Sequence, residues 1–322
     1  MTQYRRADLS KVRTISIRNR KSKVTPARFA VPFNARRDSF SQFARSLPGF
    51  LAADDLRAVV DDIVSARRRG APVLLMMGAH VIKVGLAPLL IDLIKRQVVT
   101  AVAMNSAAAI HDTETALWGE TSEDVAATMR DGSFGMAEET GRFINGTLLE
   151  GYWESDYGYG EALGKKILAL RAPYRKLSVL ATCVRLKVPV SVHAAIGTDI
   201  VHQQPTMDGA ATGEMSFRDF QMLCETCKGL ARGGVVLNIG SAVIMPEVFL
   251  KALTLARNLG HKVAPLTTVN LDFVQHYRPL TNVVRRPTAG AGRGYALTGH
   301  HELLLPLLAA LVIEEMENGD AH

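Results

Sequence analysis

The sequence predicts an α/β protein built on a Rossmann-like, mostly parallel sheet with helices on both faces. Short continuous apolar runs, such as 73–77 and 235–239, are typical of strands that are buried on both faces of a parallel sheet. Longer segments with apolar residues at helical spacing separate these runs. Repeated alternation of the two kinds of segment favours a parallel sheet with crossover helices.

In the first part of the chain, 1–50 is basic and irregular, and three prolines interrupt it. The next segment, 54–69, carries apolar residues at helical spacing and ends at Gly70, so it predicts a helix. Gly78 ends the first apolar run, and Pro88 lies where the first turn of a helix tolerates proline. The expected order is strand 73–77, helix 86–96, strand 98–104 and helix 107–117.

The segment at about 120–175 predicts a helical insertion, after which strand and helix alternate again. Helical periodicity is present at 122–129, 136–144 and 162–186, the last broken near Pro173. We expect a glycine-rich loop at 288–299, because glycine is unfavourable within regular elements. The remaining expected elements are strand 189–193, helix 217–230, strand 235–239, helix 245–259, strand 263–268 and helix 301–316.

Charge divides the chain into a basic N-terminal arm, 1–50, and a body, 51–322, that we expect to be the catalytic domain. The arm holds 12 Lys and Arg against 2 Asp and Glu, whereas the rest holds 26 against 29. Basic arms can attract nucleic acid. This one has few aromatic residues and no binding motif, so we expect it to pack on the body or on a neighbouring subunit instead of on nucleic acid.

The composition is that of an ordinary globular protein, with 48% hydrophobic and 21% charged residues. The longest apolar segment, 73–94, contains His80, Lys83 and Asp92, so we expect no membrane span. No signal peptide is visible, and three cysteines suggest a reducing compartment, which together predict a cytoplasmic protein.

Cys224 and Cys227 form a CxxC pair that invites a redox or zinc interpretation. Phe217, Phe220 and the two cysteines recur at helical spacing, which places both thiols on a buried face in the middle of a helix. Reactive pairs need a helix N-terminus, and structural zinc needs about four ligands. We therefore expect core cysteines. We also expect no metal site, since the spacing of His202, His300 and His301 does not support one.

Glycine and polar residues follow four of the predicted strands, where ligands bind in open parallel sheets. Small residues let a phosphate approach backbone N–H groups, and the N-terminus of a helix adds a favourable dipole. None of the four segments is a GxGxxG motif or a P-loop, so each alone is weak evidence. The segments are 78–85, 105–114, 193–213 and 240–241, the last before a helix that carries Glu247.

His111, Asp112 and Glu114 open a helix whose other positions are mostly small and apolar. Acidic residues near a helix start are stabilising in themselves, which accounts for Asp112 and Glu114 without a catalytic role. It does not account for His111, whose side chain suits proton transfer near neutral pH. We therefore take the three as candidates for substrate binding and proton transfer.

The order of these motifs resembles the deoxyhypusine synthase superfamily over roughly 55–316. Segment 78–85 resembles the family's first nucleotide-binding turn, and 105–112 its Thr-Thr-Ala-Gly-Gly turn. The strand from Val188 resembles the one that leads to the family's Asp-containing loop. Segment 235–241 resembles the strand and glycine turn near the nicotinamide, and 298–300 the Ala-Asp-Ala turn. The resemblance implies a Rossmann-like fold, bound NAD and a homotetramer with active sites at subunit interfaces.

One departure from the family concerns its chemistry. Deoxyhypusine synthase carries an imine-forming lysine in a Trp-Gly-Lys segment, whereas the equivalent stretch here, 286–295, contains no lysine. Arginine stays protonated and cannot form the imine. The archaeal-type NAD-dependent ornithine cyclodeaminase branch does not require that lysine, and it has a His-Asp-x-Glu-x-Ala-Leu-x-Gly run. Residues 111–119 match that run at each specified position.

The sequence and its resemblance together predict an NAD-dependent enzyme that acts on an amine or amino acid through an imine, as ornithine cyclodeaminase does. One alternative is aminobutyl transfer of the deoxyhypusine or homospermidine synthase type, with a displaced lysine such as Lys83. The other is a non-catalytic NAD-binding protein of the same fold. Asp199 and Glu247 are further site candidates, and the residues assigned to NAD are Gly78, Gly85, Asn105, Ser106, Asp199, Gly240 and Ser241.

Overall fold

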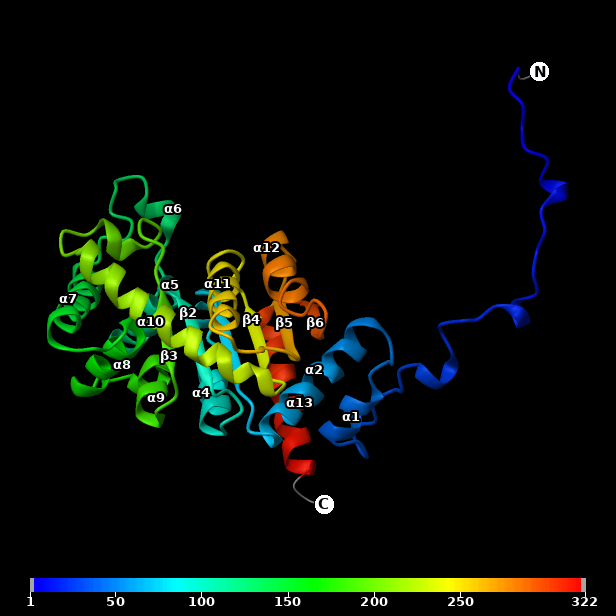
Figure 1. Ribbon diagram of the computed structural model, residues 1–322, viewed down its shortest axis with the longest axis horizontal. Coiled ribbons are helices and arrows are strands. Elements are labelled where there is room, and N and C mark those ends of the chain that lie inside the picture. The colour runs from blue at the N-terminus through cyan, green and yellow to red at the C-terminus, as the bar shows by residue number, and fades with distance from the viewer. Residues whose placement is uncertain (1–2, 320–322) are drawn as a thin grey trace. The chain divides into compact units, whose positions relative to one another are not determined.

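The computed structural model describes residues 3–319 and contains a six-stranded sheet in which every neighbouring pair is parallel. The strand order is β3-β2-β1-β4-β5-β6, so the order reverses between β1 and β4 (Figure 1). In open parallel sheets, ligands bind beyond the carboxyl ends of the strands at this reversal. The strands are β1 (Val73–Met77), β2 (Ala101–Asn105), β3 (Val190–His193), β4 (Val235–Ile239), β5 (Leu266–Asp272) and β6 (Gly292–Thr298).

Helices cover both faces of the sheet, as the alternating pattern predicts. The helices of 55–322 are α2 (Leu51–Arg68, which begins before this range), α3 (His80–Lys83), α4 (Ala87–Lys95), α5 (Ser106–Trp118), α6 (Val125–Thr128), α7 (Glu138–Glu154), α8 (Tyr159–Ala169), α9 (Val179–Leu186), α10 (Gly209–Gly229), α11 (Ile244–Asn258), α12 (Tyr277–Pro279), the π-helix η7 (Leu280–Arg285) and α13 (His301–Gly319). Single 3₁₀ turns lie at Arg175–Leu177 (η4), Ile200–Gln203 (η5) and Leu230–Arg232 (η6).

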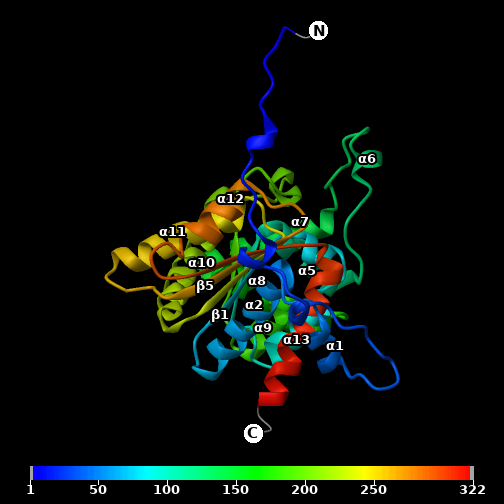
Figure 2. The ribbon, with the colours of Figure 1, turned by 90° about the vertical axis from the view of Figure 1, so that its right-hand side faces the viewer.

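Alternate residues of the strands face two apolar layers. Leu74, Met76 and Val236 pack with α10 and α11, whereas Leu75 and Leu237 border the same small void as α2, α4 and α13. All five residues of β1 and of β4 are buried, which explains why these strands read as continuous apolar runs. Figure 2 shows α10 and α11 on one side of the sheet.

Two sequence predictions about elements are wrong. The segment 288–299, expected to be a loop, forms β6, which pairs with β5 from Gly292 to Thr298. This strand is at the edge of the sheet and largely exposed, so it lacks the apolar run that marks the inner strands. Helix α10 begins at Gly209 instead of at 217, because Asp208 caps its first turn through the N–H of Ala211.

The predicted core cysteines are confirmed. Cys224 and Cys227 are free and buried within the core cluster under α10 and α11. Burial raises the pKa of both thiols, which opposes thiolate formation. Phe217, which we expected on the same buried face, is 53% exposed, because the buried stripe of α10 runs through positions 215, 219 and 223, and position 217 lies about 200° around the helix from position 215.

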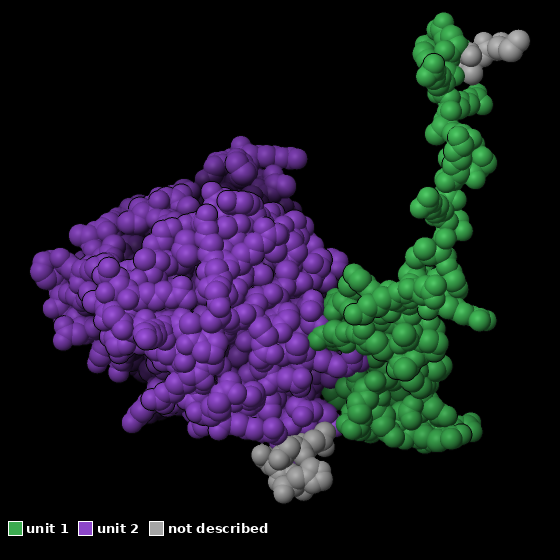
Figure 3. All heavy atoms as spheres, turned by 45° about the vertical axis from the view of Figure 1, so that its right-hand side comes forward, with its two compact units in different colours: residues 1–54 green, residues 55–322 purple. Residues whose placement is uncertain are grey.

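The chain divides into two compact units, 1–54 and 55–322 (Figure 3). Within the first unit, the described residues form single 3₁₀ turns at Leu9–Lys11, Ile17–Asn19 and Pro26–Arg28, and helix α1 at Phe40–Ser46, which begins with a capping box between Ser39 and Gln42. In the second unit, α6, α7 and α8 lie between 120 and 175. In the described part of the chain, no helix is long and apolar enough to cross a bilayer.

Candidate functional site

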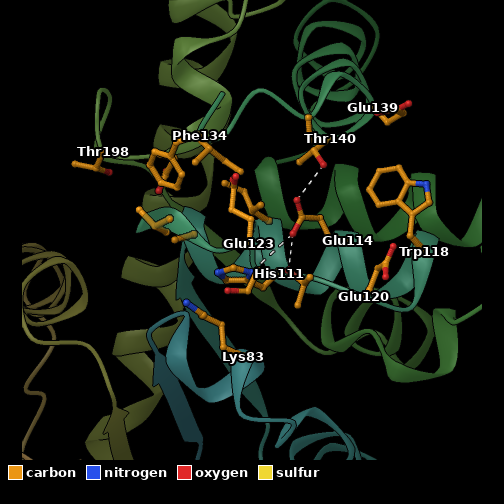
Figure 4. Close-up of a pocket in the computed structure, with 18 residues that line it drawn as sticks. Lys83, His111, Glu114, Trp118, Glu120, Glu123, Phe134, Glu139, Thr140 and Thr198 are labelled. Carbon is orange, nitrogen blue, oxygen red and sulfur yellow. Dashed lines mark hydrogen bonds and ion pairs between the residues drawn. The ribbon is translucent and has the colours of Figure 1, made fainter. Parts of the chain in front are cut away.

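A cavity of about 770 Å³ lies next to α5, beyond the carboxyl ends of β2 and β3 (Figure 4). His111 and Glu114 from α5 line it, as do Lys83 from α3 and Asp199 from the loop after β3. The segment 120–140 contributes much of the remaining wall. Its other lining residues are Ala107, Ile110, Trp118, Glu120, Thr121, Ser122, Glu123, Val125, Phe134, Ala137, Glu139, Thr140, Thr198 and Ile200.

His111 and Glu114 are joined through one hydroxyl group. Nδ1 of His111 lies 2.6 Å from Oγ1 of Thr121, and that hydroxyl donates to Oε2 of Glu114 at 2.5 Å. Because the single hydroxyl proton is used toward Glu114, Thr121 accepts from His111, which places the imidazole proton on Nδ1. Thr140 donates to the other carboxylate oxygen of Glu114 at 2.9 Å. This chain of hydrogen bonds leaves the lone pair of His111 on Nε2, where it can accept a proton.

The surroundings keep His111 neutral. Burial, together with a smaller effect of the positive charge of Lys83, lowers the pKa of this imidazole to about 4. Glu114 lies 3.8 Å from Nδ1 and would favour the charged form, but burial and Lys83 outweigh it. At neutral pH the side chain is therefore an unprotonated base.

The charge of the lining is strongly negative. Its five carboxylates face one lysine, and His111 is neutral. Such a lining attracts cations and repels phosphate groups. The five carboxylates belong to Glu114, Glu120, Glu123, Glu139 and Asp199.

Asp112 does not lie in this cavity, although it is adjacent to His111 in sequence. It is fully buried and accepts hydrogen bonds from the Ser178 hydroxyl at 2.6 Å and from the backbone N–H groups of Val179 at 2.6 Å and Leu180 at 3.2 Å. These groups form the N-terminus of α9, so the carboxylate fastens α9 to α5. Successive residues of a helix point about 100° apart, which separates Asp112 from the face of His111 and Glu114. The contacts favour a structural role over the proton transfer predicted from sequence.

Asn105, Ser106 and Asp199 meet at the ends of β2 and β3. The Asn105 side chain caps α5 through the N–H of Ala108 at 3.0 Å, and the Ser106 hydroxyl donates to Asp199 in a short hydrogen bond. Nε2 of His202 lies 3.8 Å from the same carboxylate, and its Nδ1 accepts from the backbone N–H of Gly197 and of Asp199, each at 3.2 Å. Burial raises the pKa of Asp199, while Ser106 and His202 oppose the increase.

Gly78, Gly240 and Ser241 gather where the strand order reverses. A Cβ on Gly78 would lie 2.1 Å from the carbonyl oxygen of Gly240, so the two turns touch through their backbones. Gly240 has φ +63°, a conformation that favours glycine. The hydroxyl of Ser241 accepts from the N–H of Met245 in the first turn of α11. Gly85, with φ +78°, ends the turn after α3, and a Cβ there would meet open space.

Glu247 lies apart from the cavity, on the exposed side of α11. Its carboxylate pairs with Lys251 and contacts Arg278 at 3.5 Å and Asn282 at 2.9 Å. The hydrogen bond from Lys251 holds the pKa of this carboxyl below its usual value. Within 3–319, no group of three or more His, Cys, Asp or Glu side chains is arranged to hold a metal ion.

Thr121 is the member of the site that the sequence does not reveal. It follows α5 after the left-handed turn at Gly119, and only that turn brings its hydroxyl back to His111 and Glu114. Thr140 and Glu139 reach the cavity from α7, in the segment expected to be a helical insertion. The spacing of His111 and Glu114, three residues apart on a helix, is the signal that does predict a shared face.

No protein-family model matches the chain, and a search of curated proteins finds no match. Several solved structures are similar. The ternary complex of AgrE with ornithine and NAD⁺ aligns over 82% of this chain and 34% of its own length, at 14% identity and a TM-score of 0.52. A protein from Methanococcus maripaludis S2 described as LOR/SDH aligns over 84% and 70%, at 13% identity and a TM-score of 0.50.

A protein from Entamoeba histolytica described as a deoxyhypusine synthase aligns over 87% of this chain and 94% of its own length, at 11% identity and a TM-score of 0.51. This chain therefore spans nearly the whole of one similar structure but about a third of the AgrE chain. At these identities the likeness concerns the fold, and it confirms the fold class predicted from the sequence.

Proposed function

We propose that this chain, which has a deoxyhypusine synthase-like fold, is an NAD-dependent enzyme that oxidises the C–N bond of a cationic amine or amino acid to an imine. The observation that carries the proposal is the His111–Thr121–Glu114 relay in an acidic cavity beside the carboxyl ends of the strands. The structure of AgrE, a complex with ornithine and NAD⁺ that shares this fold over about a third of its length, supports it. Assembly as a homotetramer rests on the family resemblance alone.

The residues at the reversal of strand order fit NAD. A Cβ on Gly78 would meet the carbonyl oxygen of Gly240, and a Cβ on Gly240 would meet the ring of His301, so the two glycines let these turns pack together at the point where a pyrophosphate would approach. The 15-residue helix α11 begins there, and its N-cap residue, Val243, makes no side-chain capping hydrogen bond. In its first turn the N–H of Met245 is bonded to the Ser241 hydroxyl and Pro246 has no N–H, so the N–H of Ile244 and the helix dipole are what favour an anion. The acidic cavity does not favour an anion. We therefore assign the cofactor to the reversal point, where the strand order reverses between β1 and β4, and the substrate to the cavity.

Bound NAD would supply a hydride acceptor for the carbon that bears the amine. His111 would remove the proton of the substrate ammonium through Nε2, because an amine must be neutral before its carbon can lose a hydride. Glu114 and Thr121 would keep the imidazole in the Nδ1–H tautomer and stabilise the imidazolium that forms. Asp199, fixed by Ser106, would hold a second cationic group of the substrate.

A panel of ornithine, putrescine and spermidine, each incubated with the purified protein and NAD, tests the proposal. We expect mass spectrometry to show that one of these amines is consumed and that ammonia or a smaller amine is released. The negative charge of the cavity predicts faster turnover for amines with greater positive charge. If NAD binds but no amine reacts, the proposed enzymatic function is wrong, and the chain is instead a non-catalytic NAD-binding protein.

The position of Lys83 favours a second candidate function. This exposed lysine lines the cavity, and its charge acts on His111. Once the C–N bond of the substrate is oxidised to an imine, a lysine amine can displace the leaving amine and hold the aminobutylidene group as its own imine. Lys83 could therefore replace the lysine missing from 286–295 in a transfer reaction.

Replacement of Lys83 by arginine separates the two functions. Arginine keeps the positive charge but forms no imine, so C–N oxidation is expected to stay within a few fold of wild type. Borohydride treatment during turnover is expected to leave the mass of the wild-type protein unchanged. A borohydride-stable adduct on Lys83, together with an inactive arginine variant, would instead assign the chain to aminobutyl transfer.

A further inference from the structure

A hollow of about 410 Å³ lies at the amino edge of the sheet, whereas the acidic cavity lies at the carboxyl edge. The first residues of β5 and β6 line the hollow, together with the turn before β4 and the residue that follows α2. The seven residues of β5 separate the two edges of the sheet by about 20 Å. We call this second site the amino-edge hollow.

Three arginines from distant parts of the chain line the amino-edge hollow. Arg69 follows α2, Arg232 lies in the turn before β4, and Arg293 is in the first turn of chain within β6. All three are exposed, so their guanidinium groups are open to a ligand. Among the described residues of the lining, Asp62 is the one acid. Three positive charges against one negative charge leave an excess of two positive charges.

The charge of Asp62 is largely compensated by its neighbours. This side chain is buried, and its Oδ2 accepts from the Thr267 hydroxyl at 2.8 Å. Its Oδ1 pairs with the guanidinium of Arg293. The carboxylate therefore fixes Arg293 at the amino-edge hollow, and the excess positive charge belongs to Arg69 and Arg232. An anion that enters the hollow meets that excess.

Arg69 is held in place by the turn before β4. Its Nε and Nη2 donate to the carbonyl oxygens of Arg232 and Gly233 at 3.4 and 3.2 Å, and its Nη1 donates to the Ser65 hydroxyl at 2.6 Å. A guanidinium has five N–H donors, so two of them remain for a ligand. A side chain that is already ordered loses little conformational freedom on binding.

Arg232 keeps all of its side-chain donors. Within 3–319, its guanidinium makes no hydrogen bond and no ion pair, although the main chain of the same residue holds Arg69. The amino-edge hollow therefore combines a fixed guanidinium, a guanidinium tied to a carboxylate and a free one. Guanidinium groups bind the oxygens of phosphate in pairs through their planar fork of N–H groups.

We propose that the amino-edge hollow binds a small molecule through a phosphate group, which accepts from the free N–H donors of Arg69, Arg232 and Arg293. The excess of two positive charges matches a phosphate dianion. A volume of about 410 Å³ is within the range of small-molecule sites and leaves room for more than one phosphate ion. Among the described residues of the lining, no acid, base or nucleophile is unpaired, so the ligand is bound as an effector and is not transformed.

Calorimetric titration of the full chain with inorganic phosphate, pyrophosphate and ribose 5-phosphate tests the proposal. Saturating NAD is present, because it fills the other anion site that we assign, at the reversal point. We expect Arg232→Gln to weaken binding of the tightest of the three probes by about tenfold, the effect of losing hydrogen bonds to one charged group. Arg232→Lys keeps the charge without the fork and should lie between this variant and the wild type. The matched control is Arg185→Gln, an exposed arginine on α9, which should leave the affinity unchanged.

A second variant addresses Arg293 on β6. Arg293→Lys keeps a cation beside Asp62 but lacks the fork that binds phosphate, so it should also weaken binding of the tightest probe. Thermal unfolding checks that this variant is folded. If Arg293→Lys does not fold, the result for Arg232→Gln decides, because Arg232 is exposed and its side chain has no partner within 3–319.

The outcomes also identify the source of the phosphate group. Tightest binding of phosphate or pyrophosphate supports the site with an inorganic ion as its ligand, and tightest binding of ribose 5-phosphate supports it with a phosphate ester. Unchanged affinity in both Arg232→Gln and Arg293→Lys overturns the site, and so does a wild type that binds none of the three probes. The inference does not depend on the proposed function. If NAD does not bind, a loss of affinity in Arg232→Gln still supports the amino-edge hollow, which lies at the opposite edge of the sheet from the reversal point.

Discussion

His111→Ala is expected to lower turnover by about 10²- to 10⁴-fold, the usual contribution of a positioned general base. The affinity for NAD is expected to stay within about twofold, since the imidazole lines the acidic cavity and not the turns at Gly78 and Gly240. Steady-state kinetics on the amine that reacts, together with calorimetric titration of NAD, measure the two effects. Unchanged turnover would remove His111 from the mechanism.

Two further variants test how His111 works. His261→Ala, an exposed histidine near the end of α11, is the control and should leave turnover unchanged. Thr121→Val keeps the shape of the side chain but removes the hydroxyl that joins His111 to Glu114. It should lower kcat more than it raises KM, because it disturbs the tautomer of the base and not the charges of the cavity. In the wild type, the acidic limb of kcat/KM should fall at about pH 4, where His111 becomes protonated.

Asp112→Ala is expected to destabilise the protein by about 3 kcal/mol or more, a large effect for one side chain. The substitution leaves the Ser178 hydroxyl and the N–H groups of Val179 and Leu180 unpaired in a buried site. Urea unfolding, followed by circular dichroism, measures the loss. Asp156→Ala, at an exposed position, is the control and should stay within about 0.5 kcal/mol of the wild type. A similarly small change for Asp112→Ala would contradict the structural role.

The pH dependence of stability tests the same carboxylate in another way. Burial raises the pKa of Asp112 to about 6, against hydrogen bonds from Ser178, Val179 and Leu180 that lower it. The folded state therefore binds this proton more tightly than the unfolded state does. The contribution to stability is fully present below about pH 4 and is lost as the pH rises through about 6. Asp112→Asn should remove this loss between pH 4 and 6, measured as the difference in unfolding free energy between variant and wild type.

Local patterns were sufficient to predict the alternating strands and helices. The inner strands β1 and β4 are buried on both faces, so burial appears directly as a run of apolar residues. The residues of edge strand β6 are mostly exposed and its sequence is glycine-rich, so the same signal is absent there. The helical spacing of His111 and Glu114 also predicted one shared face, because it depends only on the 3.6-residue period.

Contacts between distant parts of the chain decided the composition of the site. Asp112 is next to His111 in the sequence, yet its carboxylate accepts a hydrogen bond from Ser178 at the start of α9, 66 residues further along the chain. Ser106 and Asp199 share a hydrogen bond across 93 residues, which the parallel pairing of β2 with β3 makes possible.

The sequence by itself determined the fold class, the core cysteines and the histidine and glutamate on one helical face, since each follows from local periodicity and burial. Only the tertiary structure decided that Thr121 joins that pair, that Asp112 fastens α9, and that Arg69, Arg232 and Arg293 line one hollow. The physical reason is that these contacts depend on strand order and loop geometry, which bring residues together regardless of their separation along the chain.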